Sequence, residues 1–173
     1  MSQLKVNSIV PVGGLPSGSN GGIIQVVQAV KTNTASTTST SFVDTGLTAS
    51  ITPSLNSSKI LVMVNMPIGA ESAGARFLTN LVRGSTDIFR GDASGSRQRC
   101  SWQSTRGSEV DQQWICSICF LDSPATTSST NYKMQWKTEG SSHEIYLNMN
   151  ARNHDSDTHG MTASSITLFE VTT

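Results

Sequence analysis

The apolar run at positions 60–64 constrains the fold of this chain more than any other feature. Its sequence is Ile-Leu-Val-Met-Val, the longest stretch in which both side-chain parities are apolar. Successive side chains of a β-strand point to opposite faces, so the run predicts a strand that is covered on both sides. Ser57 and Ser58 before it and Pro67 after it limit the run to strand length, well short of a membrane span. A buried helix is the alternative, and the strand-like alternation of the flanking segments favours the strand.

Alternating apolar and polar residues predict further strands along most of the chain. The segment 76–90 is predicted to form a hairpin, because Arg83-Gly84-Ser85-Thr86 in its middle reads as a tight turn. Charged residues are only 14% of the sequence, against roughly 25% in ordinary domains, and Ser and Thr together make up about a quarter. We therefore expect an all-β fold, an antiparallel two-sheet β-sandwich that is jelly-roll-like, with an extended N-terminal arm. The expected strands cover residues 23–31, 42–51, 57–67, 76–82, 87–90, 114–120, 132–137, 145–150 and 166–171.

The chain divides into an arm with a hinge, residues 1–22, and a β-sandwich head, residues 23–173. Residues 13–22 are rich in Gly, Ser and Asn, a composition typical of flexible linkers. The segment before this hinge is too short to bury its own apolar residues, so it is predicted to dock on another protein or on the head. A frayed terminus is the alternative. The residues predicted to anchor the arm are Leu4, Val6, Ile9 and Val10.

Charge and cysteine content exclude several classes of protein. The net charge is zero, which argues against nucleic-acid binding, and no apolar run is long enough for membrane insertion. The three Cys are an odd number and no signal peptide precedes them, so a disulfide framework is not expected. Cys116 and Cys119 are three positions apart, so in one strand they face opposite sides and cannot share a metal ion. We expect the chain to fold in a reducing cytosol.

The longest polar excursion of the head lies between residues 91 and 107, and its length makes it a candidate contact loop. Trp114 and Trp136 fit apolar faces and are predicted to lie in the core, whereas Trp102 lies in this loop, where it is a candidate contact residue. The candidate contact residues of the loop are Asp92, Arg97, Arg99, Trp102 and Arg106.

No catalytic motif rises above chance, so an enzyme is not expected, nor is a cofactor. The glycine-rich tracts lack the features of a phosphate loop, and no carboxylate pair suits glycoside cleavage. One polar segment, residues 153–160, suggests a divalent ion, particularly where subunits meet on a symmetry axis. Its spacing matches no standard metal site, and an ordinary surface turn is the alternative reading. The residues concerned are His154, Asp155, Asp157 and His159.

Apolar residues on the second face of the strand at 113–121 predict an oligomer. One set of alternate residues in this strand is apolar and is expected to face the core. The other set, which faces away from the core, also contains apolar residues, namely Ile115, Cys119 and Leu121. A sandwich sheet normally shows one face to its core and the other to water, so this second face needs cover. Closed symmetry is the common solution, so a closed homo-oligomer with this strand near the axis is expected.

Several phrases of the sequence resemble small virion fibre proteins of tailed bacteriophages, most closely those of phages of cyanobacteria and other aquatic bacteria. The resemblance covers nearly the whole chain. The phrases are SQLKVNSIVP at residues 2–11, GIIQVVQAVK at 22–31, TGLTASITPS at 45–54, SKILV at 58–62, RGST at 83–86, LDSPA at 121–125 and ASSITLFEV at 163–171.

This resemblance implies a virion protein that is assembled in the host cytoplasm, commonly a trimer with a β-sandwich head and an N-terminal anchor on other virion proteins. It implies a tail-fibre or tail-tip component that contacts a glycan or protein on the host surface. A decoration or cement protein that stabilises the capsid or tail is the alternative. A sugar-cleaving enzyme is disfavoured because the carboxylate pair is missing.

Overall fold

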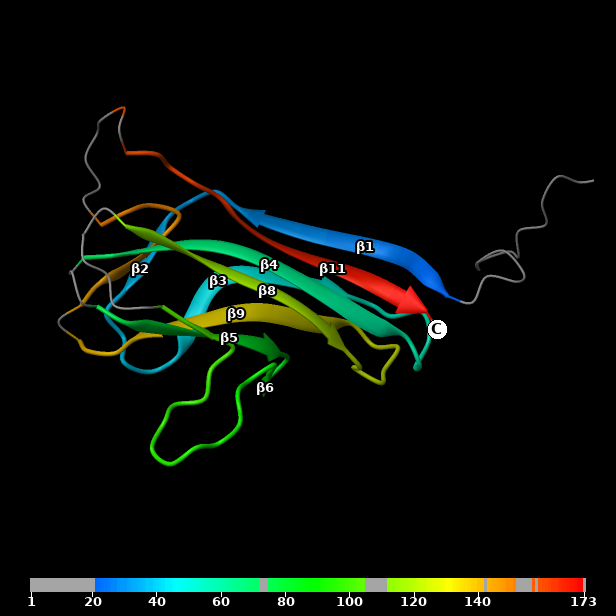
Figure 1. Cartoon of the computed structure of the whole chain (residues 1–173). Coiled ribbons are helices and arrows are strands. Elements are labelled where there is room, and N and C mark those ends of the chain that lie inside the picture. Colours follow the sequence, from blue (N-terminus) through cyan, green and yellow to red (C-terminus); the bar gives the residue numbers. More distant parts are fainter. Residues whose placement is uncertain are drawn as a thin grey trace, which may run out of the picture.

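A computed structural model gives the structure of the chain and describes residues 21–71, 75–104, 112–141, 143–151, 157 and 159–172. Within these residues every regular element is a β-strand, and the strands form two antiparallel sheets that pack face to face (Figure 1). The predicted all-β sandwich is thereby confirmed. Residues 1–20 of the predicted arm and hinge, which include the anchoring residues, lie outside the described residues, whereas Gly22 already belongs to the first strand.

The first sheet has six strands in the order β1-β11-β4-β10-β2, and β8 pairs with the free side of β4. The short strand β10 pairs with β4 beyond the end of β11, and the short strand β2 pairs with β10, so these two strands extend the sheet past β11 and β1. The strands are β1 (Gly22–Lys31), β2 (Ala35–Thr37), β4 (Lys59–Ala70), β8 (Gln113–Asp122), β10 (Ile145–Leu147) and β11 (Ser164–Thr172).

The second sheet has five strands in the order β3-β9-β5-β6, and β7 pairs with β5 beside β6. The chain crosses from one sheet to the other after β2, β3, β4, β7, β8 and β9, so most neighbours within a sheet come from distant parts of the sequence. This is the strand order of a jelly roll. The strands are β3 (Val43–Ile51), β5 (Phe77–Arg83), β6 (Thr86–Ile88), β7 (Trp102–Gln103) and β9 (Thr130–Thr138).

The core lies between the two sheets and follows the alternation of the sequence. Tyr132, Met134 and Trp136 of β9 are buried, and every second residue of β4 from Ile60 to Ala70 is buried opposite them. Trp114 packs on the same cluster, edge to face with Phe77 at 5.6 Å between ring centroids. The core positions predicted for both tryptophans are therefore confirmed, as is the 76–90 hairpin, in which Gly84 adopts a left-handed φ of 59°.

Strand β4 does not end at Pro67, as the sequence predicted, but continues to Ala70. The Pro67 carbonyl accepts a hydrogen bond from the Asn148 N–H at 3.0 Å, so the missing N–H of Pro67 faces the same neighbouring line of strands. On that side β4 pairs with β11 only as far as Asn65, and its pairing with β10 starts at Ile68 of β4. The proline therefore lies opposite the gap between two strands, where no ladder hydrogen bond is lost.

The second face of β4 is not covered by the described residues, which corrects the expectation of cover on both sides. Met63 is 45% exposed, although Val62 and Val64 beside it are buried. Two residues before Met63, at the level of Leu61, an apolar row crosses the outer face of the first sheet, because four side chains of four strands are in register. The row is Val26, Phe169, Leu61 and Leu121.

Candidate binding site

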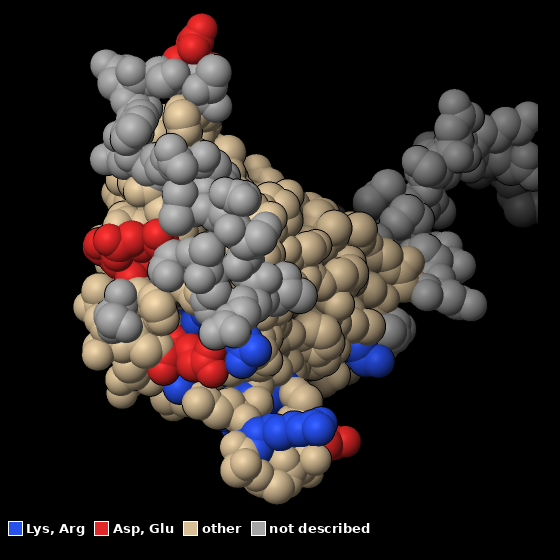
Figure 2. All heavy atoms as spheres, turned by 60° about the vertical axis from the view of Figure 1, so that its left-hand side comes forward, with Lys and Arg blue, Asp and Glu red and all other residues tan. Residues whose placement is uncertain are grey.

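Residues 89–101, called here the projecting segment, leave the hairpin after β6 and return to β5 as β7. They stand out from the sandwich as a lobe that carries both basic and acidic side chains (Figures 1 and 2). Phe89 begins the segment with a left-handed φ of 53°, and its ring packs against Phe120 with centroids 4.9 Å apart. The segment is therefore attached at its start by an aromatic contact.

Ser101 attaches the other end of the projecting segment to β5. Its N–H donates to the Thr79 carbonyl at 2.9 Å, and its hydroxyl accepts from the Leu81 N–H at 2.9 Å. The same hydroxyl donates to the Ile88 carbonyl at 3.2 Å. One serine thus ties together β5, the end of β6 and the return of the segment, so the lobe has a fixed base.

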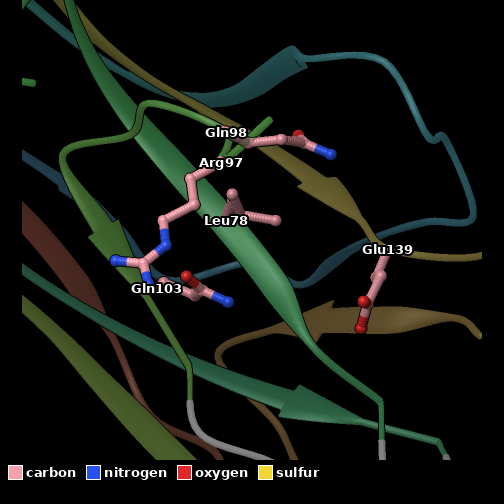
Figure 3. A pocket seen from close by; sticks show the side chains of 5 residues that line it. All are labelled: Leu78, Arg97, Gln98, Gln103 and Glu139. Carbon is pink, nitrogen blue, oxygen red and sulfur yellow. The ribbon is translucent and has the colours of Figure 1, made fainter. Parts of the chain in front are cut away.

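A pocket lies between the projecting segment and the second sheet. Its volume is about 480 Å³. Leu78 belongs to the face of β5 that points away from the core, and the polar side chains stand around it (Figure 3). Two come from the segment, one from β7 and one from the residue after β9. The lining residues are Leu78, Arg97, Gln98, Gln103 and Glu139.

The pocket contains both signs of charge. Arg97 contributes a guanidinium group, and Glu139 contributes a carboxylate that is 3.5 Å from Arg76, with both side chains of that pair well exposed. A long, exposed ion pair of this kind contributes little to stability and leaves the carboxylate accessible. The pocket can therefore both donate and accept hydrogen bonds without a dominant charge.

Asn80 is a buried polar residue with no partner. It lies two positions after Leu78 on the same face of β5 and is 0% exposed. Neither its amide nitrogen nor its amide oxygen has a hydrogen-bond partner in the described structure. Gln135 lies opposite on β9, but the Gln135 amide donates to Asp44 at 2.8 Å. Buried amides are nearly always paired, so this one calls for an explanation.

Beyond the pocket, the outer face of the second sheet is polar and its charges are paired. Lys133 donates to Asp44 at 2.8 Å, and this hydrogen bond is the main reason why the pKa of Asp44 lies below its usual value. The Gln135 amide lowers the Asp44 pKa further. Lys137 lies over the ring of Phe42, 5.4 Å from its centroid. These contacts explain why the face is a stable, solvated surface rather than an apolar one.

The predicted contact loop proves to contain residues with different roles. Arg97 lines the pocket and Asp92 is exposed, whereas the Arg99 side chain donates to the Gly91 carbonyl at 2.7 Å and so holds the segment itself. Trp102 lies in β7 rather than in a loop, and its ring packs on the core with its centroid 5.8 Å from that of Phe77. Arg106 lies outside the described residues.

Sequence reasoning missed four lining residues and the buried amide. Leu78, Asn80, Gln98, Gln103 and Glu139 belong to no motif, and isolated Gln, Asn and Leu residues carry no signal of a site. They come together because β7 returns to β5 from the far end of the projecting segment, a pairing that local periodicity does not encode.

The suggested ion site at residues 153–160 is only partly within the described structure. Asp157 and His159 are described, whereas His154 and Asp155 are not. Among the described residues, no group of three or more His, Cys, Asp or Glu side chains lies close enough to hold a metal ion. The ion site therefore stays a prediction.

The cysteines lie as the strand parity predicted. Cys116 is fully buried and Cys119 is exposed on the opposite face of β8. Burial raises the pKa of the Cys116 thiol to about 11, against a smaller opposing effect of the Thr79 hydroxyl 3.3 Å away. Cys116 therefore belongs to the core as a neutral thiol.

Comparisons with known proteins add no assignment to this geometry. No protein-family model matches the sequence, and no curated protein matches it. No helix in the described part of the chain is long and apolar enough to cross a membrane. The functional argument therefore rests on the surfaces of the sandwich and on the resemblance of the sequence phrases.

Proposed function

We propose that this protein is a structural component of a tailed-bacteriophage virion, a tail-fibre or tail-tip protein whose head contacts the host surface. It has no enzymatic activity in this proposal, and it assembles in the host cytoplasm with other virion proteins. The phrase resemblance supports the family. The observation that carries the assembly role is the uncovered apolar outer face of the first sheet.

This face has the character of an interface rather than of a solvated surface. Val26, Ile115 and Leu121 are 56%, 50% and 46% exposed, and Met63 lies among them. Among the outward residues of β8, none is charged. A monomeric protein rarely shows a contiguous apolar surface of this kind, so a neighbouring subunit is its natural cover.

The free edge of β8 supports the same conclusion. Within the described residues, β8 pairs with β4 alone, so it is an edge strand of ten residues. Long edge strands of soluble proteins usually carry lysine, proline or a bulge to prevent pairing with other chains, and β8 has none of these in its ladder. We propose that three copies meet with β8 near a common axis, since closed symmetry covers the face without open-ended growth.

Deletion of residues 1–20 tests the proposal on phage particles. The deletion should leave a folded head that no longer joins the particles, because Leu4, Val6, Ile9 and Val10 are then missing. A head-surface variant, Asp92→Ala, serves as the matched control and should be incorporated normally. Incorporation of the truncated chain at wild-type levels contradicts the anchoring role.

The position of the protein on the particle tests the attachment role. A reconstruction of the virion should place a small number of copies at the tail fibres or tail tip, with the projecting segments pointing outward. Purified protein should also compete with the phage for adsorption to host cells. If many copies are spread over the capsid and the purified protein does not compete for adsorption, the attachment role is contradicted and the decoration role is supported.

A further inference from the structure

We infer that the pocket around Leu78, together with the buried amide of Asn80 beside it, is a binding site for a neutral mono- or disaccharide unit. The inference deepens the proposed attachment function and rests on it for its biological meaning. Its test uses only the isolated protein, however, so the two can fail separately.

The polarity of the lining selects this class of ligand. Gln98 and Gln103 each provide an amide that both donates and accepts hydrogen bonds, which matches the donor and acceptor character of sugar hydroxyls. Arg97 adds donors only and Glu139 adds acceptors only. The carboxylate disfavours a phosphate or other strong anion, and the guanidinium disfavours a cation.

The shape of the pocket agrees with its polarity. A volume of about 480 Å³ falls within the roughly 300–1,000 Å³ of small-molecule sites. The apolar surface at its floor comes from Leu78, and no aromatic side chain is among the lining residues, so a nucleobase has no ring to stack on. A compact ligand with many hydroxyls and a small apolar face fits better than a flat aromatic one.

Asn80 is the independent observation that points to a ligand. An unpaired buried amide destabilises a protein, and the fold gives no structural reason to keep one at this position. Polar groups retained at the expense of stability are typical of functional sites. Asn80 is 0% exposed in the ligand-free structure, so a sugar can pair with it only after a local opening, and in this proposal the turn that carries Arg97 and Gln98 provides that opening.

That turn is built in a way that permits such movement. Residues 91–99 are all exposed, and Gly95 at the tip has a left-handed φ of 56°. The Arg97 N–H donates to the Ser94 carbonyl at 3.1 Å, which closes the turn on itself rather than on the sheet. The fixed points of the segment are at its two ends, Phe89 and Ser101, so the turn can shift while the base stays in place.

An NMR titration of the isotope-labelled, full-length protein tests the inference. The probes are free glucose, galactose, mannose, rhamnose, N-acetylglucosamine and their common disaccharides, each at millimolar concentration. We expect at least one sugar to shift backbone and side-chain amide signals of Gln98, Gln103 and Asn80 together. Shifts confined to other surfaces, or no shift with any probe, would overturn the site.

Variants separate binding from folding. Gln103→Leu removes one exposed amide and should weaken binding about tenfold, the effect of losing about 1.4 kcal/mol, without a change in Tm. Gln28→Leu removes an exposed amide on the other sheet and is the matched control, which should bind as the wild type does. Equal binding by Gln103→Leu and wild type would overturn the assignment.

Asn80→Leu gives a readout that a merely structural residue does not. Replacing the unpaired amide by an apolar side chain of similar size should raise Tm by about 2–4 °C and at the same time weaken sugar binding. A rise in Tm with unchanged binding would remove Asn80 from the site. If no sugar binds while the protein still blocks phage adsorption, the saccharide site is wrong and the attachment function stands, with a protein receptor as the next candidate.

Discussion

Glu170 shows at the scale of one residue how this sandwich tolerates a buried carboxylate. It lies on β11, is 0% exposed, and accepts hydrogen bonds from the Ser54 N–H at 2.6 Å and the Ser58 hydroxyl at 2.7 Å. The Ser54 hydroxyl adds a contact at 3.2 Å. The carboxylate therefore holds the turn between β3 and β4 against the first sheet.

Loss of this carboxylate should destabilise the fold. Glu170→Ala leaves the part-buried Ser54 N–H and the buried Ser58 hydroxyl without their partner, and we expect the free energy of unfolding to fall by about 2–3 kcal/mol. Urea denaturation followed by tryptophan fluorescence measures the change. Glu139→Ala, an exposed glutamate, is the control and should stay within about 0.5 kcal/mol of the wild type. Equal effects of the two substitutions would contradict the role of Glu170.

Trp136 is the largest fully buried side chain of the core. Trp136→Ala should lower the free energy of unfolding by about 3–5 kcal/mol, the usual range for truncating a buried aromatic residue. The neighbouring Lys137→Ala, on the outer face of the same strand, is the comparison for a partly exposed position. A loss below about 1 kcal/mol at Trp136 would be inconsistent with its burial.

Cys116 should make the stability depend on alkaline pH. Its pKa is raised from 9.0 to about 11 in the folded protein, so the unfolded chain loses its thiol proton first as pH rises. The associated stability is fully present below pH 9 and is lost as pH rises through about 11, by about 2–3 kcal/mol in total. Chemical denaturation between pH 8 and pH 11 measures this loss, and Cys116→Val, which cannot titrate, is expected to show correspondingly less of it. Parallel pH curves for the two proteins would contradict the assignment.

At the scale of the element, β4 is the strand on which the first sheet depends. It pairs with β8 from Ile60 to Gly69 and, on its other side, first with β11 and then with β10. Asn148 stabilises this second junction, because its side chain donates to the Lys31 carbonyl at 2.8 Å and accepts from the Ser164 hydroxyl at 2.6 Å. The change of partner along β4 therefore brings β1, β10 and β11 together at one corner.

Gly69 is required at this corner because the backbone of the chain after β10 approaches it closely. A Cβ atom at residue 69 would lie 2.5 Å from the Met149 carbonyl oxygen and 2.8 Å from the Asn150 Cα. Gly69→Ala should therefore destabilise the protein by about 1–3 kcal/mol, measured by thermal unfolding. Gly91→Ala is the matched control, because a Cβ there meets nothing within 4 Å. Equal melting temperatures for wild type and Gly69→Ala would show that the corner can relax at no cost.

At the scale of the whole molecule, the two sandwich faces have different surfaces. The outer face of the second sheet carries paired charges and the pocket, whereas the outer face of the first sheet carries the apolar row at Leu61 and Leu121. This division fits a subunit that meets other copies on one side and solvent or a ligand on the other.

The oligomeric state tests this division. Light scattering of the purified protein at micromolar concentration should give the mass of three chains, because the apolar face needs a neighbour. Leu121→Glu should give the mass of one chain, and Ser96→Glu, at an exposed position of the projecting segment, should leave the trimer intact. A monomeric wild type would contradict the interface, and a dimer would retain the covered face but exclude the three-fold axis. Cys119 offers a second readout, since its reaction with an alkylating reagent should slow as the trimer forms.

Local alternation in the sequence predicted most of the strands and the orientation of their side chains, whereas the short strands β2 and β7 were not among those expected. Period-two alternation is a local property, so the core positions of Tyr132, Met134 and Trp136, the hairpin at Gly84, and the opposite faces of Cys116 and Cys119 all follow from it. The all-β class follows from the same alternation together with the low charge and the turn residues. These features depend on neighbours in the chain and not on strand pairing.

Which strands become neighbours is a property of the folded chain and not of any one segment. The tolerance of Pro67 within β4 depends on the gap between β11 and β10, and the packing of the partly buried Trp102 on the core depends on the pairing of β7 with β5. The pocket depends on the same pairing, since Leu78, Gln103 and Glu139 lie far apart in sequence and belong to no motif. Pairing between distant strands is set by the packing of the whole sandwich, which no local pattern of residues contains.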